Sequence, residues 1–254
     1  MRMILLQPGA AAVRLGALAL CAVALAGCQG ITGVRPAAQV RIIDASPDAP
    51  PMDIAQVAPV PVVPMGLYNV GFGAVSSYIP TSAGTYTHAA MVAGTGQQLA
   101  LARGTFTAGG QYTLLAGNIA AGLQLAVLKD QATPALPGQI ALRILGQATR
   151  AGAVDIYFVP AGSSGAGLAP LVSAVSFGAN SGYLTAPAGT YSIVVYAAGA
   201  TAGTAVPLYT GGQVSYAPTS VRTILLVDRR AEAGDPSSAH GLQVITASDY
   251  DPAG

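Results

Sequence analysis

Short runs in which apolar and polar residues alternate recur along most of the chain, and they predict β-strands. In the first run, Val40 and Ile42 alternate with Arg41. Successive side chains of a strand point to opposite faces, so this spacing is the one expected of a strand. Prolines and aspartates then break the run, and a second strand is predicted at residues 52–57. Further strands are predicted at residues 99–106, 111–116, 123–129, 191–196, 206–209, 221–227 and 242–246.

The opening segment occurs twice, which indicates a duplicated unit. Residues 40–54, VRIIDASPDAPPMDI, align without a gap with residues 142–156, LRILGQATRAGAVDI, at an offset of 142 − 40 = 102. A second shared block surrounds Phe72 and Phe177, at an offset of 177 − 72 = 105, and an Ala-Gly-Thr-Tyr unit follows it in both copies. The change of offset places a short insertion between the two blocks, as is typical of a loop that varies between copies of one fold.

The composition favours strands over helices. Only 8% of the 254 residues are charged, with one lysine, one glutamate and no tryptophan, whereas helix surfaces usually carry lysine, glutamate, glutamine and arginine. Hydrophobic residues make up 52% of the chain, too many for a disordered protein. Without Arg2 and Arg14 near the start, nine basic residues face ten acidic ones. No basic patch is present, so we do not expect nucleic-acid binding.

The first 28 residues have the pattern of a secretory signal. Arg2 and Arg14 supply positive charge, and residues 15–26 form an apolar run of about a dozen residues, too short to span a bilayer core. The run ends in Leu-Ala-Gly-Cys at residues 25–28, which resembles the lipobox of bacterial lipoproteins. The resemblance implies cleavage before Cys28, lipidation of its sulfur and acylation of the new amino terminus. Gln29 in place of aspartate resembles the class directed to the outer membrane.

The number of short strands predicts the fold. About seven strands per hundred residues, separated by turns, are typical of a β-sandwich. We therefore predict an all-β protein of two tandem immunoglobulin-like or transthyretin-like β-sandwich domains after an N-terminal signal helix. The predicted divisions are a lipoprotein signal peptide at 1–27, a tether at 28–38, sandwich repeat one at 39–132, a linker at 133–139 and sandwich repeat two at 140–254. Removal of residues 133–254 is predicted to leave the first repeat folded.

Three motifs together resemble a known family. They are Val-Arg-Ile-Ile-Asp-Ala-Ser-Pro-Asp-Ala-Pro at residues 40–50, the Phe-Gly pair before Ser-Tyr, and the Ala-Gly-Thr-Tyr unit. They resemble the bacterial domain-of-unknown-function family numbered 4397, often found in tandem in secreted or anchored proteins. Asp44 stands where the family usually has histidine, and residues 146–150 of the second repeat depart from the Ser-Pro-Asp signature. The resemblance implies a fold and a location, but no activity.

Arg41 with Asp53, and Arg143 with Asp155, are the charged residues that both repeats keep. If the strands that carry them are neighbours, each pair would form a partly buried structural ion pair. A ligand-binding role is the alternative, because charges retained in a charge-poor protein can be functional.

Other polar residues give little sign of catalytic chemistry. Asp44, Ser46 and Asp48 alternate as at the start of a calcium loop, but alanine occupies the sixth and twelfth positions. A proline-rich turn with Asx-type hydrogen bonds is predicted there instead. His88 and His240 lie in different repeats without partners at metal spacing, and no nucleophile elbow or P-loop occurs. We therefore predict no catalytic, metal or cofactor site and no enzyme.

These observations favour a lipid-anchored cell-envelope protein that acts as a structural, adhesive or protein-binding module. The alternative is a carbohydrate- or solute-binding accessory lipoprotein. The expected partners are the membrane, through lipidated Cys28, and an envelope protein or polysaccharide. The expected location is the bacterial cell envelope, periplasmic or surface-exposed, with the outer membrane favoured. A cleft with convergent polar side chains would favour ligand binding, and flat exposed sheets would favour adhesion.

Overall fold

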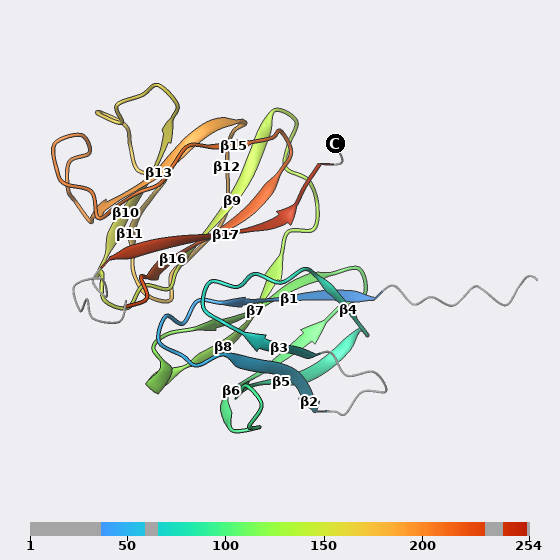
Figure 1. The fold of residues 1–254 in the computed structure, drawn as a ribbon. Coiled ribbons are helices and arrows are strands. Elements are labelled where there is room, and N and C mark those ends of the chain that lie inside the picture. The colour runs from blue at the N-terminus through green and yellow to red at the C-terminus, as the bar shows by residue number, and fades with distance from the viewer. Residues whose placement is uncertain (1–36, 59–65, 232–240, 253–254) are drawn as a thin grey trace, which may run out of the picture. The chain divides into compact units, whose positions relative to one another are not determined.

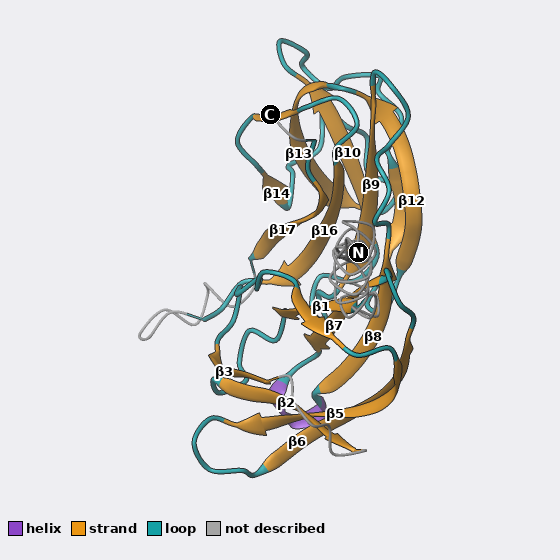
Figure 2. Ribbon diagram, turned by 90° about the vertical axis from the view of Figure 1, so that its right-hand side faces the viewer, coloured by secondary structure: helices purple, strands orange, loops and turns teal. Residues whose placement is uncertain are grey.

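The computed structural model describes residues 37–58, 66–231 and 241–252 of the chain. The predicted signal peptide at 1–27, Cys28 and most of the predicted tether lie outside these residues. Two β-sandwiches follow each other within the unit that begins at Ala37 (Figure 1). Strands and loops form nearly all of the described chain, with a turn of 3-10 helix at Ala120–Gly122 (Figure 2). None of the described helical structure is long and apolar enough to cross a bilayer.

Eight strands form the first sandwich. Their bounds are β1 (Ala38–Asp44), β2 (Met52–Ala58), β3 (Gly66–Val70), β4 (Ile79–Thr81), β5 (Gly84–Val92), β6 (Gln98–Phe106), β7 (Gln111–Gly117) and β8 (Gln124–Asp130). One sheet has the strand order β4-β1-β7-β8 and the other has the order β3-β2-β5-β6. The central strands β1 and β7 pair in parallel, and the other pairs are antiparallel.

The second sandwich repeats this arrangement. Its strands are β9 (Gln139–Gly146), β10 (Val154–Pro160), β11 (Val172–Val175), β12 (Asn180–Pro187), β13 (Gly189–Ala197), β14 (Tyr209–Thr210), β15 (Val214–Tyr216), β16 (Val221–Asp228) and β17 (Leu242–Tyr250). One sheet has the order β12-β9-β16-β17, with β9 and β16 parallel. The other has the order β11-β10-β13, and both β14 and β15 pair with β13. The prediction of an all-β sandwich fold is confirmed.

Each sandwich has its own apolar core, which the alternation of its strands produces. In β1, Val40 and Ile42 point inward and meet Met52 and Ile54 of the opposite sheet. In the second sandwich, Leu142 and its neighbours on β9 fill the same place opposite β10. Burial of one such side chain contributes about 1.5–3 kcal/mol. Each repeat therefore contains enough apolar contact for a sandwich core.

A third apolar cluster joins the two sandwiches. It consists of residues that point away from the two cores, and it includes Ile43, Leu115, Leu145, Leu225 and Ile245. Strands β1, β7, β9 and β16 are thus buried on both faces, which accounts for the adjacent apolar residues in each of them. The sheet that contains β1 and the sheet that contains β9 pack against each other through this cluster.

The predicted linker at residues 133–139 packs on the second sandwich. The N–H of Ala135 donates a hydrogen bond to the carbonyl of Thr219 at 2.9 Å, and the Ala135 side chain is buried against Val221. The carbonyl of Gly138 accepts a bond from the N–H of Ala188 at 3.0 Å. These contacts hold the connection against the second sandwich.

One predicted strand needs correction. Residues 206–209 were expected to form a strand, but β14 comprises only Tyr209 and Thr210. Pro207 has no N–H to donate, and residues 198–208 form a loop between β13 and β14. Strand β12, which the sequence pattern did not predict, pairs with β9 over Asn180–Pro187.

Candidate functional site: the charge cluster between the sandwiches

The two retained arginines occupy equivalent places on the faces that the sandwiches present to each other. Arg41 lies on β1 and Arg143 on β9, each in the middle of a sheet. The parallel neighbour strand places a threonine beside each arginine: Thr113 pairs with Arg41, and Thr223 pairs with Arg143. Because inward and outward residues alternate, both arginines point away from their own cores and into the interface.

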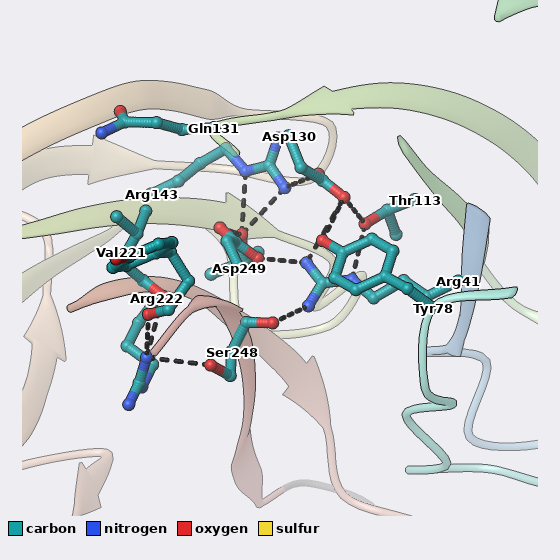
Figure 3. Close-up of polar contacts among 12 residues, drawn as sticks. Arg41, Tyr78, Thr113, Asp130, Gln131, Arg143, Val221, Arg222, Ser248 and Asp249 are labelled. Carbon is teal, nitrogen blue, oxygen red and sulfur yellow. Dashed lines mark hydrogen bonds and ion pairs between the residues drawn. The ribbon is translucent and has the colours of Figure 1, made fainter. Parts of the chain in front are cut away.

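Arg41 reaches across to the last strand of the second sandwich. Its Nε donates to Thr113 Oγ1 at 2.8 Å, and its Nη1 donates to the carbonyl of Ser248 at 2.7 Å (Figure 3). Its Nη2 forms an ion pair with Asp249 Oδ1 and lies 3.7 Å from Asp130 Oδ2. The guanidinium therefore contacts carboxylates of both repeats.

Arg143 makes the reciprocal set of contacts to the last strand of the first sandwich. Its Nη2 donates to Asp130 Oδ1 at 2.6 Å, and its Nη1 donates to the carbonyl of Lys129 at 3.0 Å. Its Nε and Nη2 donate to Thr223 Oγ1 at 3.1 and 2.8 Å. Each arginine thus pairs with the aspartate of the other repeat and bonds the carbonyl of the residue before that aspartate.

Hydroxyl groups donate further hydrogen bonds to the two aspartates. Asp130 Oδ2 accepts hydrogen bonds from the hydroxyls of Thr113 and Tyr78 at 2.6 and 2.8 Å. Asp249 Oδ2 accepts the equivalent bonds from Thr223 and Tyr183, both at 2.6 Å. We call these eight residues the charge cluster: Arg41, Tyr78, Thr113, Asp130, Arg143, Tyr183, Thr223 and Asp249.

The two tyrosine rings also cover the two guanidinium groups. The Cζ atom of Arg41 lies 4.9 Å from the centre of the Tyr78 ring, and the Cζ atom of Arg143 lies 4.9 Å from the centre of the Tyr183 ring. A cation this close to an aromatic face gains about 0.5–2 kcal/mol, more where water is excluded.

The charges of the cluster are almost completely removed from water. Arg41 is 1% exposed, Arg143 2%, and the carboxylate-bearing side chains of Asp130 and Asp249 are fully covered. Burial would lower the pKa of Arg41, but Asp249 and Asp130 outweigh it, and the pKa lies above the ordinary value. Burial and the neighbouring aspartates raise the pKa of Tyr78 and Tyr183. The arginine is therefore charged and both phenols are protonated donors at neutral pH.

The cluster holds the two sandwiches in one relative orientation. Two positive and two negative charges balance, and both carboxylates accept bonds from hydroxyls as well as guanidinium groups. A buried ion pair gives little net stability, but it strongly disfavours any arrangement that leaves one charge unpaired. A shifted or rotated packing of the sandwiches would do so, because the shortest ion pair of each arginine, Arg41 with Asp249 and Arg143 with Asp130, crosses between the repeats.

The structure does not bring together the residue pairs expected from the sequence. Arg41 was expected to pair with Asp53, and Arg143 with Asp155. Arg41 instead forms ion pairs with Asp249 and Asp130, and Arg143 forms one with Asp130. The reason is topological: β1 and β2 belong to opposite sheets of the first sandwich, as β9 and β10 do in the second.

The two retained aspartates have a separate role, in which each binds backbone amides on both sides of its strand. Asp53 accepts N–H bonds from Asn69 and Gly94, both at 2.9 Å. Asn69 lies in β3, where the pairing with β2 shifts its register, and Gly94 lies in the turn after β5; their φ values are +55° and +72°. The amide bonds lower the pKa of Asp53.

Asp155 repeats this arrangement in the second sandwich. Its carboxylate accepts N–H bonds from Ala174 and Gly199, both at 2.8 Å, and these residues have φ values of +54° and +79°. Each retained aspartate thus ties an irregular position of the neighbouring edge strand, β3 or β11, to the turn after the strand on its other side, which explains why the sequence keeps it in both copies.

Asp130, Asp249, Thr113 and Thr223 were not singled out from the sequence. A signal was present, because Thr113 and Thr223 lie at the same place in the strands 111–116 and 221–227, and an aspartate is the last or the penultimate residue of the last strand of each repeat. Their offsets are 223 − 113 = 110 and 249 − 130 = 119, so insertions hide the match from an ungapped comparison.

The Asp-Ala-Ser-Pro-Asp segment at residues 44–48 forms a turn, as predicted. Asp44 Oδ1 accepts the N–H of Ser46 at 2.9 Å, which is an Asx-type bond, and Asp48 Oδ1 accepts the N–H of Ala120 at 2.9 Å. Within the described ranges, no group of three histidine, cysteine or acidic side chains is placed to hold a metal ion. His240 lies outside those ranges.

Two buried groups of the first sandwich respond to pH in opposite directions. His88 on β5 is fully buried, packs edge-on against Phe106 at 5.2 Å, and has no hydrogen-bond partner for either ring nitrogen among the described residues. Burial lowers the pKa of His88 from 6.5 to about 4. Burial raises the pKa of Asp44 from 3.8 to about 6, although the N–H of Ser46 and the charge of Arg230 oppose this.

The two shifts are expected to oppose each other in the stability of the folded protein. As the pH falls below 6.5, the unfolded chain takes up the histidine proton first, so His88 destabilises the fold increasingly until about pH 4. Between about pH 6 and 3.8 the folded chain takes up the Asp44 proton first, which stabilises the fold. At about 1.4 kcal/mol per pKa unit, each contribution reaches roughly 2–3 kcal/mol near pH 4.5.

Single substitutions separate the two contributions. Relative to the wild-type chain, His88→Met is expected to gain about 2–3 kcal/mol on going from pH 7.0 to 4.5, and Asp44→Asn to lose about 2 kcal/mol. Urea unfolding of the three proteins at both pH values measures these differences. Parallel pH profiles for His88→Met and wild type would contradict the burial of a neutral histidine.

Comparisons with known proteins cover part of the chain. The model of the family "Domain of unknown function (DUF4397)" matches residues 38–157, which is the whole first sandwich together with β9 and the start of β10. This match supports the domain family for that part of the chain. No curated protein matches the chain.

Several solved structures show weak likeness. A leucine-rich repeat protein from Bacteroides thetaiotaomicron has 13% identity and a TM-score of 0.22 over 74% of this chain, which spans only 26% of that protein. The TIE protein of Bacillus anthracis has 8% identity and a TM-score of 0.25, and the likeness covers 84% of this chain and 44% of that protein. A proposed cell adhesion protein from Bacteroides eggerthii has 8% identity and a TM-score of 0.22, and the likeness covers 86% of this chain and 97% of that protein. At these scores the likenesses carry no weight for function.

Proposed function

We propose that the protein is a lipid-anchored module of the bacterial cell envelope with a structural or adhesive role. The charge cluster carries this proposal. Its positive and negative charges are equal in number, buried, and paired with each other across the two sandwiches. The cluster therefore holds the two sandwiches in one arrangement and does not present a reactive group to solvent. A module that spaces or attaches other envelope components needs such a fixed arrangement of its domains.

The location rests on the leader. Residues 25–28, Leu-Ala-Gly-Cys, follow a charged start and an apolar run, which is the order of a lipoprotein signal. Several acyl chains on Cys28 would hold the protein at a membrane stably, since each buried methylene contributes about 0.8 kcal/mol. The residue after Cys28 is Gln29 rather than aspartate, which favours the outer membrane as the location of the anchored protein.

We further propose that the second sandwich is a second copy of the same domain. The family match ends at residue 157, but the second sandwich has the same sheet orders around β9 and β10 and the same arginine, aspartate and tyrosine positions. Duplication followed by loop insertion explains both the shared residues and the changing offset between copies.

Substitution of Cys28 tests the anchor. Cys28→Ala is expected to abolish retention in the membrane fraction and incorporation of a labelled fatty acid, because the acylated sulfur is lost. Cys21→Ala is the matched control, since Cys21 lies within the predicted leader, and it should leave both unchanged. If Cys28→Ala remains in the membrane fraction through its apolar run, the lipoprotein assignment is wrong.

An attachment assay tests the adhesive role. Beads that carry the mature chain through its amino terminus are expected to bind purified envelope fragments, and beads that carry the unfolded chain are not. Equal binding by folded and unfolded chains would count against a role for the fixed two-sandwich body.

A further inference from the structure

The outer face of the β10–β13 sheet in the second sandwich is built differently from its counterpart in the first. Along β10, Phe158 points into the core, whereas Tyr157 and Val159 point outward. Tyr196 and Val194 of β13 also point outward and pack with them, the rings of Tyr157 and Tyr196 meeting edge-on at 5.4 Å. The first repeat has Ala55 at the position of Tyr157, 102 residues earlier.

Two loops cover this face. Residues 161–171 connect β10 to β11, and residues 198–208 connect β13 to β14; both lie beside β10 and β13 in Figure 1. Ala202 of the second loop is buried against the two tyrosines, and the N–H of Gly203 donates to the Tyr196 hydroxyl at 3.4 Å. In the first sandwich, residues 93–97 alone connect the equivalent strand β5 to its neighbour. The second loop is therefore an addition of the second repeat.

A cavity of about 260 Å³ remains between the loops and the sheet. Its polar lining comes from hydroxyl groups, and its apolar lining includes an aromatic ring and a valine: Tyr157, Val159, Ser163, Ser164, Ser192 and Thr210. Most small-molecule sites combine an apolar wall with a few polar groups in this way.

The hydroxyls of the cavity are available to a ligand. Tyr157 is only 5% exposed, and none of the described residues forms a hydrogen bond with its hydroxyl. The hydroxyl itself is not fully buried, so a ligand in the cavity can take the place of the water that it would otherwise bond. The oxygens of Ser163 and Ser164 accept the N–H groups of Gly165 and Ala166, which leaves the hydroxyl protons free to be donated.

The surroundings of the cavity are uncharged. From residue 156 to residue 221 the sequence contains no aspartate, glutamate, lysine, arginine or histidine. A charged ligand would lose hydration there without gaining an opposite charge. A neutral ligand with several hydroxyl groups would match the hydroxyl lining and could place its C–H groups against the tyrosine and valine.

We propose that this cavity binds one neutral pyranose unit of a polysaccharide or glycolipid. The proposal deepens the adhesive role by naming the class of ligand. It rests on that proposed role only for the place where the protein would meet the sugar, the cell envelope. The added loop, the hydroxyl lining and the uncharged surroundings all belong to the second sandwich, so the two repeats have different tasks. The first sandwich comes directly after the predicted membrane anchor in the sequence and connects the second sandwich to it. The second sandwich binds the sugar.

Saturation-transfer NMR on the full mature chain tests the proposal with glucose, galactose, mannose and N-acetylglucosamine. At least one of these sugars is expected to bind, with a dissociation constant in the millimolar range, and glucuronate is expected not to bind. Thr210→Trp, which fills the cavity from an exposed position, should abolish the signal.

Two further variants keep the test independent of folding. Tyr157→Phe removes only the unpaired hydroxyl and should weaken binding about tenfold, as expected for one lost hydrogen bond. Tyr68→Phe makes the same change on a tyrosine that is 75% exposed in the first sandwich and should have no effect. The proposal is overturned if no neutral sugar gives a signal, if glucuronate binds as well, or if Thr210→Trp binds unchanged. Because these measurements use isolated protein, their failure leaves the anchor and bead assays unaffected.

Discussion

Replacing Arg41 by methionine is expected to lower the free energy of unfolding by about 3–5 kcal/mol, the usual cost of removing one partner from a buried ion pair. The variant leaves two covered carboxylates, Asp130 and Asp249, with one guanidinium between them. Methionine fills much of the space but donates no hydrogen bond to Thr113 or to the carbonyl of Ser248. Urea unfolding at neutral pH measures the loss, and the thermal midpoint should fall by roughly 10 °C.

Arg222 provides a matched control for this substitution. It also forms an ion pair within the second sandwich, but its partner Asp251 has a side chain that is 59% exposed. Water screens this ion pair, but Arg222 also donates to Ser248 Oγ and to the carbonyls of Val221 and Tyr250, so Arg222→Met should cost about 1–2 kcal/mol, clearly less than Arg41→Met. If Arg41→Met and Arg222→Met cost the same, the charge cluster does not hold the sandwiches together.

Removing all four charges is expected to restore much of the lost stability. The variant with Arg41→Met, Arg143→Met, Asp130→Leu and Asp249→Leu leaves no unpaired buried charge, and apolar replacements of buried ion pairs are often neutral or stabilising. The cost should appear instead in the relative orientation of the sandwiches. Small-angle X-ray scattering would then show a wider range of arrangements than in the wild type.

The alternation of apolar and polar residues made the strands predictable. Residues such as Val40 and Ile42 have a period of two that only a strand explains, and β2, β6, β7, β8 and β16 were predicted within a residue or two of their bounds. Short edge strands such as β4 and β15 were not predicted, because a strand of three residues shows no period. The backbone pairing of a neighbour, rather than its own sequence, makes such a segment a strand.

The site was harder to predict because its partners are far apart in the sequence. The duplication identified Arg41 and Arg143 as retained charges, but pairing each with the nearest retained acid assumed that consecutive strands are neighbours. In this fold they lie in opposite sheets, and the true partner of Arg41, Asp249, is 208 residues away. The adjacent apolar residues Ile42-Ile43 of β1 and Ile144-Leu145 of β9 did contain a clue, since a strand with apolar residues on both faces requires a second layer beyond its own sandwich.

Isolating the first sandwich, residues 38–132, is expected to produce a folded protein that forms a homodimer. The fragment keeps its own core, as predicted from the sequence, but it exposes Ile43, Leu115 and the charges of Arg41 and Asp130. A second copy offers the arginine, aspartate, threonine and tyrosine that the second sandwich offers in the intact chain, since each member of the charge cluster has a counterpart of the same residue type. Such a surface is self-complementary, which is the requirement for an isologous dimer.

Sedimentation velocity and circular dichroism over a range of concentrations measure this association. Arg41→Met in the fragment should yield a monomer or an unfolded chain, because the reciprocal ion pairs cannot form. Arg103→Met makes the same change at an exposed position on β6, in the opposite sheet, and should leave the dimer intact. A stable monomer of unchanged thermal midpoint at all concentrations would show that the sandwich does not depend on the face that it buries against its partner. The charge cluster would then orient two independent domains instead of completing the fold of each.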